Sequence, residues 1–202
     1  FRLAFPRSAD ALGIVYTPTE LVDFILRSVN DLLVTEFGTT ISAPGVHVLD
    51  PFTGTGTFIT RLLASGLIAP EDLARKFTSE LHANEITLLA YYIAAANIEA
   101  TFHDLTASFA ADAVAPASAD PRAWVPFDGI VLADTFQMSE HEDVLDGLVF
   151  RTNSERAERQ LDLDIRVIVG NPPFPRKWSC CGVVCGHVEP DPSDVEAGPF
   201  AA

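Results

Sequence analysis

The sequence VHVLDPFTGTG at residues 46–56 decides the fold of this 202-residue chain. Its apolar first half predicts a short buried strand over Val46–Asp50. The glycines at positions 54 and 56 predict a tight turn, after which a helix continues through Phe58 to Leu63. A strand that ends in an acid and is followed by Gly-x-Gly and a helix is typical of α/β proteins that bind a ligand at the carboxyl ends of their strands.

Three more short strands are predicted downstream, at Thr78–Asn84, Ile130–Ala133 and Ile165–Gly170. Strands that alternate with helices indicate a parallel sheet with helices on both faces, which is an α/β fold. An amphipathic helix that ends near Phe37 precedes the first strand, and its apolar positions are Leu21, Phe24, Ile25, Val29, Leu32 and Leu33. The other expected segments are a short helix from Pro70, a buried helix at Ile86–Ile98, a long loop from His103 to Phe127, and weaker helices at Glu140–Leu148 and Ser154–Leu161.

Thirteen basic and 28 acidic residues give the chain a net charge of −15. Because clustered Lys and Arg bind phosphate backbones, this charge argues against the chain being the main surface that grips a nucleic acid. No apolar run reaches the roughly 20 residues of a membrane span and no signal sequence opens the chain, so we expect a cytoplasmic protein with no membrane partner. Cys180, Cys181 and Cys185 lie together before His187 and lack the second ligand pair of a zinc site, so no metal is expected.

The Gly-x-Gly turn suits a ligand with one anionic and one cationic group, such as the methionine part of S-adenosylmethionine. Gly54 and Gly56 have no Cβ and allow the backbone to approach a ligand closely. The helix that follows offers unpaired N–H groups to a carboxylate. The Asp50 carboxylate would accept hydrogen bonds from the ammonium group, directly or through water. A glycine-rich turn without a ligand is the alternative interpretation of this segment.

Two further acids follow predicted strands and are candidates for the same ligand. Glu85 would accept hydrogen bonds from both ribose hydroxyls. It lies farther from Asp50 than the roughly 20 residues typical of such an acid, so Leu67–Arg75 is interpreted as an insertion. Asp134 would contact the adenine amino group of the cofactor. The alternatives are a surface acid that opens a helix at Glu85 and a helix cap at Asp134.

The motif Asn171-Pro172-Pro173-Phe174 follows the last predicted strand and suits a catalytic loop. An amine attached to an aromatic ring or an acyl group is a poor nucleophile because its lone pair is delocalised. If the Asn171 side-chain oxygen and the Pro172 carbonyl accept its two N–H groups, the lone pair is directed at an electrophilic methyl group. The prolines fix φ and hold the two acceptors in place, while Phe174 offers a face for stacking a base. The alternative is an ordinary Pro-Pro turn after a strand.

These segments resemble the N-terminal part of an N6-adenine-specific DNA methyltransferase. YTPTELVDFI resembles the cofactor-side motif of that family, DPFTGTGTF its cofactor loop, and NPPF its catalytic loop. Together with ELHANEITLLAYYIAAANIE and DGIVLADTFQ, they are most similar to the methyltransferase core of the large single-chain Type ISP restriction-modification enzymes. The resemblance covers roughly Leu12 to Phe174. By position it implies cofactor contacts at Thr17, Asp50, Phe52, Gly54, Gly56, Glu85 and Asp134, and catalytic roles at Asn171, Pro172, Pro173 and Phe174.

The resemblance implies a Rossmann-like S-adenosylmethionine-dependent methyltransferase sheet that methylates adenine N6 in DNA. The family's sheet has seven strands, of which the last three and a target-recognition domain follow the catalytic loop, whereas 28 residues follow Phe174 here. We therefore expect residues 1–174 to be a partial methyltransferase domain, incomplete after the fourth strand, with a bare apolar edge at Val167–Val169. Residues 175–202 are expected to be an irregular tail, either disordered or translated out of frame. DNA would be bound through regions mostly absent here.

We expect this chain to be a truncated fragment of such an enzyme, which binds the cofactor but has weak or no activity by itself. Other interpretations stay open. Methyltransferases that act on guanine N2 of ribosomal RNA or on a protein glutamine have similar Asn-Pro-Pro-aromatic loops, although the Tyr16-Thr17-Pro18 segment favours DNA. A remnant without function is a further alternative. A dinucleotide oxidoreductase would leave Asn171–Phe174 without a role.

Overall fold

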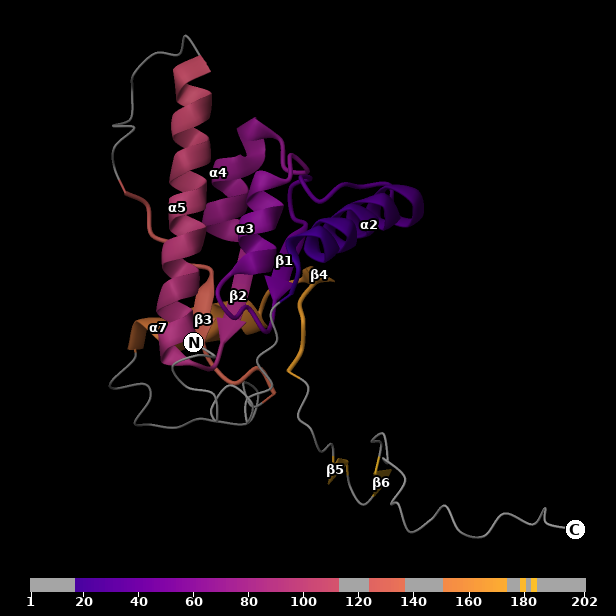
Figure 1. Ribbon diagram of the computed structural model, residues 1–202, viewed down its shortest axis with the longest axis vertical. Helices are drawn as coiled ribbons and strands as arrows, with labels where there is room; N and C mark the ends of the chain where they lie inside the picture. Colours follow the sequence, from indigo (N-terminus) through magenta and orange to yellow (C-terminus); the bar gives the residue numbers. More distant parts are fainter. Residues whose placement is uncertain (1–16, 113–123, 137–150, 174–178, 181–182, 185–202) are drawn as a thin grey trace, which may run out of the picture. The chain divides into compact units, whose positions relative to one another are not determined.

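The computed structural model describes residues 17–112, 124–136, 151–173, 179–180 and 183–184. The described residues from 17 to 172 belong to one unit, which is built around a four-stranded parallel sheet (Figure 1). Its strands are β1 (His47–Asp50), β2 (Leu81–Glu85), β3 (Ile130–Leu132) and β4 (Ile165–Ile168), in the order β3-β2-β1-β4. The predicted α/β fold with a Rossmann-like, incomplete sheet is therefore confirmed for this part of the chain.

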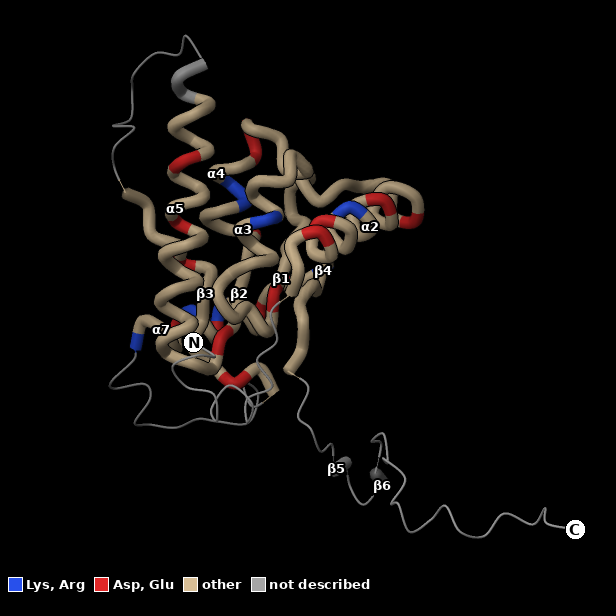
Figure 2. Tube along the Cα trace, in the orientation of Figure 1, with Lys and Arg blue, Asp and Glu red and all other residues tan. Residues whose placement is uncertain are grey.

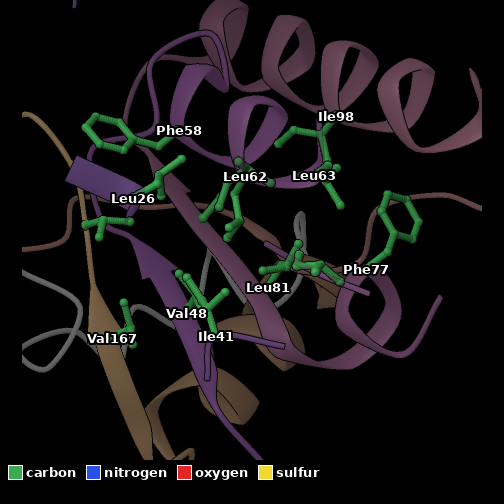
Figure 3. Close-up of a cluster of buried hydrophobic side chains, with 14 of the residues drawn as sticks. Leu26, Ile41, Val48, Phe58, Leu62, Leu63, Phe77, Leu81, Ile98 and Val167 are labelled. Carbon is green, nitrogen blue, oxygen red and sulfur yellow. The ribbon is translucent and has the colours of Figure 1, made fainter. Parts of the chain in front are cut away.

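Helices connect the strands and cover both faces of the sheet, as parallel pairing requires. α3 (Thr57–Ala64) and α5 (Leu88–Asp112) follow β1 and β2, and α7 (Arg151–Leu161) precedes β4. Side chains of α3 and α5 point onto one face, and the faint orange-brown helix α7 lies below the other (Figure 3). The residues that form this core include Val48, Phe58, Leu62, Leu63, Phe77, Leu81, Ile98 and Val167.

The helix before the first strand, α2 (Thr19–Phe37), buries only part of the predicted face, since Leu33 is buried and Ile25 and Val29 pack against the core. Val22, Leu26 and Leu33 are its buried residues, whereas Phe24 is 69% exposed and Leu32 is 56% exposed. Apolar residues occur on more than one side of this helix, so periodicity alone fits two rotations about its axis. Packing against α3 selects one of them.

The segment before β2 is helical, and the prediction that the strand starts at Thr78 was wrong by three residues. Leu73–Arg75 forms α4, Lys76–Glu80 forms a π-helical turn (η2), and β2 starts at Leu81. Lys76 is fully buried, and its Nζ donates to the carbonyls of Ala43 (2.9 Å) and Val46 (2.7 Å). The Lys76 ammonium group also forms an ion pair with Glu80 (2.7 Å), so its charge is compensated although it is buried. Because Ala43 and Val46 precede β1, these contacts attach the loop before β1 to the helical turn.

α5 extends to Asp112, so the prediction of a loop from His103 was wrong for the first ten residues of that loop. The alanine-rich sequence favours helix, and Phe102 continues the buried face by stacking on Phe77 at a ring distance of 3.8 Å. The chain then returns alongside α5, where Glu99 accepts hydrogen bonds from the backbone N–H of Phe127 (2.8 Å) and from Nε1 of Trp124 (3.0 Å). The prolines of the segment 103–127 are the reason that the sequence predicts a loop there, but all of them lie after the end of α5.

β4 lies at an edge of the sheet, and the predicted bare apolar edge is confirmed only in part. Val167 and Val169 are buried, while Ile168 between them is 67% exposed. Strand alternation explains this, because the two valines face the core and Ile168 faces the other side.

Several predictions fall partly or wholly outside the described residues. They concern the helix at Glu140–Leu148, Phe174, Cys181, Cys185 and His187. Within the second unit, Ser179–Cys180 pairs antiparallel with Val183–Val184 as strands β5 and β6, where no strand was predicted. In the described part of the chain, no helix has the length and apolar character to span a membrane.

Candidate functional site

The carboxyl ends of β1 and β4 lie side by side, at the point where the strand order reverses. The chain leaves β1 for β2 and β3 and then returns to the opposite side of β1 as β4. Loops that follow two adjacent strands at such a point diverge and form the usual ligand crevice of an open α/β sheet. The loop that begins at Asp50 and the loop that contains Asn171 meet there.

The Gly-x-Gly turn has the backbone shape that its sequence predicts. Gly54 and Gly56 have positive φ values of 58° and 88°. A Cβ at Gly56 would lie 3.2 Å from Cγ1 of Ile98, so both conformation and packing favour glycine there. The turn is held from outside, since Asn97 Nδ2 donates to the Thr55 carbonyl at 2.9 Å.

The Asp50 carboxyl group is buried beneath this turn, and only one of its two oxygens has a hydrogen-bond partner among the described residues. Its Oδ1 accepts the backbone N–H of Phe52 at 3.1 Å, whereas Oδ2 has no hydrogen-bond partner among the described residues. Burial, with a smaller contribution from the nearby Glu85 charge, raises the pKa of Asp50 to about 7 against the lowering effect of the hydrogen bonds. A cationic group placed at Oδ2 would stabilise the ionised form.

Glu85 lies at the end of β2 and is buried, so the alternative of a surface acid is wrong. Its Oε2 accepts the N–H of Gly54, and its Oε1 accepts the N–H of Thr87, both at 2.8 Å. The carboxylate therefore fastens the Gly-x-Gly turn to the start of α5. Each of its oxygens keeps a further lone pair for a ligand hydroxyl.

The loop after β4 contacts both Asp50 and the segment before α2. A Cβ built on Gly170 would lie 2.6 Å from Asp50 Oδ1 and 3.3 Å from Pro51 Cδ, so only glycine allows this approach. The next side chain, Asn171, donates from Nδ2 to Oγ1 of Thr17 at 3.0 Å. Pro172 follows in the same unit, Pro173 is described in the other, and Phe174 lies outside the described residues.

The loop after β3 is the third component of this edge of the sheet. Asp134 Oδ1 accepts the N–H of Phe136 at 3.0 Å and so caps its own turn. The Thr135 hydroxyl donates to the Pro51 carbonyl at 2.7 Å, and the Phe136 ring lies 5.3 Å from that of Phe52. Phe52 and Asp134 therefore lie on neighbouring loops, and their contacts with a cofactor stay predictions.

The sequence interpretation missed four residues of this site. Asn97, Thr135, Phe136 and Gly170 act through contacts between segments that lie far apart in sequence. Gly170 had a usable signal, because a glycine between a buried strand and a polar loop often marks a close backbone approach. The other three had none.

Replacing Gly170 with alanine is expected to displace the Asp50 carboxyl group or the end of β4. Overpacking of this kind costs about 1–3 kcal/mol in the free energy of unfolding, which urea titration measures. Gly38→Ala is the matched control, because a Cβ there meets no atom within 4 Å and only its φ of 62° is strained. A Gly170→Ala chain with unchanged stability would contradict the close approach.

The fold and this edge of the sheet define a Rossmann-like α/β domain with an acid, a Gly-x-Gly turn and the segment Asn171-Pro172 at the carboxyl ends of two adjacent strands. No protein-family model matches the chain, and no curated protein matches it either.

Solved structures of restriction-modification enzymes do match it. A nuclease-deletion mutant of the Type ISP restriction-modification enzyme LlaGI, in complex with a DNA substrate mimic, is 48% identical with a TM-score of 0.70, over 84% of this chain. The ATP-dependent Type ISP restriction-modification enzyme LlaBIII, bound to DNA, is 48% identical with a TM-score of 0.73, over 89% of this chain. A DrdV–DNA complex is 39% identical with a TM-score of 0.73, over 88% of this chain.

The chain spans only 13%, 12% and 16% of the lengths of the LlaGI, LlaBIII and DrdV chains. It is thus similar in sequence and fold to one segment of Type ISP restriction-modification enzymes.

Proposed function

We propose that this chain is the cofactor-binding part, with the catalytic loop, of a DNA methyltransferase within a Type ISP restriction-modification enzyme. The reaction would transfer a methyl group from S-adenosylmethionine to N6 of adenine. The observation that carries the proposal is the close approach of the two loops, because Gly170, which directly precedes Asn171 in the sequence, lies against the buried Asp50 carboxyl group.

The residues around Asp50 fit S-adenosylmethionine. The partnerless Oδ2 of Asp50 suits its ammonium group, and the glycine turn before α3 suits its carboxylate. Glu85 would accept from the ribose hydroxyls, while Phe52 and Asp134 would lie near the adenine ring. When bound, the cofactor supplies an electrophilic methyl group on a positively charged sulfur.

Asn171 and Pro172 would hold the nucleophile. The Asn171 side-chain oxygen and the Pro172 carbonyl would accept the two N–H groups of the target amine and direct its lone pair. Pro173 stiffens the loop, and Phe174 would stack on the base. The net charge of −15 is the reason to assign most phosphate contacts to other parts of a longer enzyme.

The proposal is tested with a hybrid enzyme in which residues 15–174 of this chain replace the matching segment of LlaBIII. Radiolabelled S-adenosylmethionine is offered with adenine-containing duplex DNA, with ribosomal RNA and with a glutamine-containing protein. We expect label on DNA adenine N6 and none on the other two substrates. Label on RNA guanine or on glutamine would instead support the second class of enzyme, and no label on any substrate would contradict the proposal.

Cofactor binding should depend on pH because of Asp50. Its pKa of about 7 in the folded chain lies above the ordinary aspartate pKa of 3.8, so the carboxyl group is increasingly protonated, and less able to bind an ammonium group, as the pH falls below 7. Affinity at pH 6 is expected to be roughly fivefold weaker than at pH 7, from the fraction ionised at each pH. Calorimetry at both pH values measures this, and Asp50→Asn should show no binding at either pH. A flat profile for the unaltered chain would exclude Asp50 as the ammonium partner.

The raised pKa of Asp50 affects stability in the opposite direction: cofactor affinity increases with pH, whereas the free energy of unfolding decreases. Between about pH 4 and pH 7 the folded chain holds a proton on Asp50 that the unfolded chain releases, so the Asp50 contribution to stability falls as the pH rises.

A further inference from the structure

The turn before α3 leaves only some of its N–H groups free for the carboxylate of S-adenosylmethionine. The N–H groups of Gly54 and Gly56 are already used, by the Glu85 carboxylate at 2.8 Å and by a carbonyl within the turn at 2.9 Å. The N–H groups of Thr55 and Thr57 have no partner among the described residues. If the proposed function is right, a ligand carboxylate at this turn is therefore bound by Thr55 and Thr57.

The direction of these two N–H groups is not fixed by the sequence of the turn alone. Thr55 lies between Gly54 and Gly56, and glycine has the least restricted backbone of all residues. Thr55 is also exposed, so packing of its side chain does not hold it in place. A fixed direction therefore requires a contact from another element of the fold.

We propose that Asn97 of α5 is a positioning residue that fixes this turn for carboxylate binding. Its Nδ2 donates to the Thr55 carbonyl at 2.9 Å. A backbone carbonyl oxygen only accepts hydrogen bonds, so the NH2 group of Asn97 has to face Thr55. The same peptide group is held at its other end by the hydrogen bond from the Gly56 N–H. This inference rests on the proposed function and adds to it a residue that acts through the turn.

The peptide group that Asn97 holds leads directly into the first turn of α3. The next carbonyl, that of Gly56, accepts the N–H of Thr60 at 2.9 Å and so points along the helix. In a trans peptide group the carbonyl and the following N–H point in opposite directions, so the Thr57 N–H points out of the start of α3. This is the end of a helix that attracts an anion.

Asn97 itself is carried by a part of α5 that is packed against the turn. Ala94 and Ile98, on either side of it in the sequence, have no exposed surface. A Cβ at Gly56 would lie 3.2 Å from Cγ1 of Ile98 and 3.4 Å from the backbone of Ala94. The position of the Asn97 side chain is therefore set by helix packing.

The proposal is tested by calorimetric titration of the 202-residue chain with two ligands. They are S-adenosylmethionine and decarboxylated S-adenosylmethionine, which lacks only the carboxylate. In Asn97→Ala we expect affinity for S-adenosylmethionine to fall about fivefold, as expected from one neutral hydrogen bond. Affinity for the decarboxylated ligand should stay within twofold, because Asp50, the partner of the ammonium group, is held by its own contact with Phe52.

Asp104→Ala is the matched control for this experiment. Asp104 is an exposed residue of the same helix, and its side chain has no hydrogen-bond partner among the described residues. We expect the control to bind both ligands as the unaltered chain does. Asn97→Leu, which keeps the branching of the side chain and lacks a donor, should give the same result as Asn97→Ala.

A merely structural role of Asn97 would give a different result, because a loosened helix or turn would weaken both ligands alike and lower the stability to urea. Equal losses for the two ligands, or no loss for either, would overturn the positioning role. Failure of the proposed function has its own signature, because the unaltered chain would then bind neither ligand, and this inference would fall with it.

Discussion

Replacing Asn171 with alanine in the hybrid enzyme is expected to lower methyl transfer at least a hundredfold. Removing one preorganised polar group at a reacting centre costs on the order of 10²–10³ in rate. Affinity for S-adenosylmethionine should stay within a few-fold of normal, because Asp50, the glycine turn and Glu85 make their contacts without Asn171. Labelled-methyl transfer and calorimetry measure the two quantities separately.

Asn171→Asp is the matched variant for this experiment. It keeps an acceptor oxygen at the same position and loses the NH2 group that contacts Thr17. We expect an activity between those of the alanine variant and the unaltered hybrid. If Asn171→Ala transferred methyl groups at the normal rate, the catalytic assignment of this loop would be wrong.

Replacing Gly129 with alanine is expected to have the largest effect on stability. A Cβ at this position would lie 2.1 Å from the carbonyl oxygen of Leu81 and 2.9 Å from the ring of Phe127. The backbone cannot simply move away, since the Gly129 carbonyl accepts the N–H of Ala83 at 3.0 Å in the β2–β3 pairing. We expect a loss of about 3 kcal/mol in the free energy of unfolding.

Urea unfolding followed by circular dichroism measures this loss, with Gly66→Ala as control. Gly66 has a φ of 75° and open space around it, so alanine there should cost about 1 kcal/mol from backbone strain alone. Equal losses in the two variants would mean that β3 does not approach β2 as closely as described.

The strands were predictable because each is a short apolar run between turn signals. Val46–Asp50 and Ile165–Gly170 differ from β1 and β4 by only one or two residues. The region between α3 and β2 was not predictable. Its π-helical turn depends on Lys76, whose hydrogen bonds to the carbonyls of Ala43 and Val46 join residues 33 and 30 positions apart. Helix and strand periods carry no trace of such a contact.

The face of α2 shows a second limit of sequence patterns. Leu21 and Val22 are both apolar, and only the shape of the neighbouring α3 decides that Val22 is the buried one. Likewise, the pattern around His103 could not show that Glu99 would bind the returning chain at Trp124 and Phe127 and so support a longer α5.

For the site, spacing and residue type identified the groups but not how they connect. The acids Asp50 and Glu85 and the motif at Asn171 were predictable because each follows a strand. Three contacts depend on tertiary packing and could not be predicted. Glu85 accepts a hydrogen bond from Gly54, Gly170 lies against Asp50, and Asn171 donates a hydrogen bond to Thr17. The cofactor-binding and catalytic roles of all the site residues stay predictions.

The most direct test of the central claim is calorimetric titration of the 202-residue chain with S-adenosylmethionine at pH 7, with Asp50→Asn as control. Asparagine keeps the hydrogen bond to Phe52 and removes the charge, so the control should fold normally. We expect the unaltered chain to bind S-adenosylmethionine saturably at one site and to release a fraction of a proton as Asp50 ionises, and we expect no binding in the control. If the unaltered chain folded cooperatively but bound no S-adenosylmethionine, the proposed cofactor site would be wrong. The same would follow if the Asp50→Asn variant bound it as tightly as the unaltered chain.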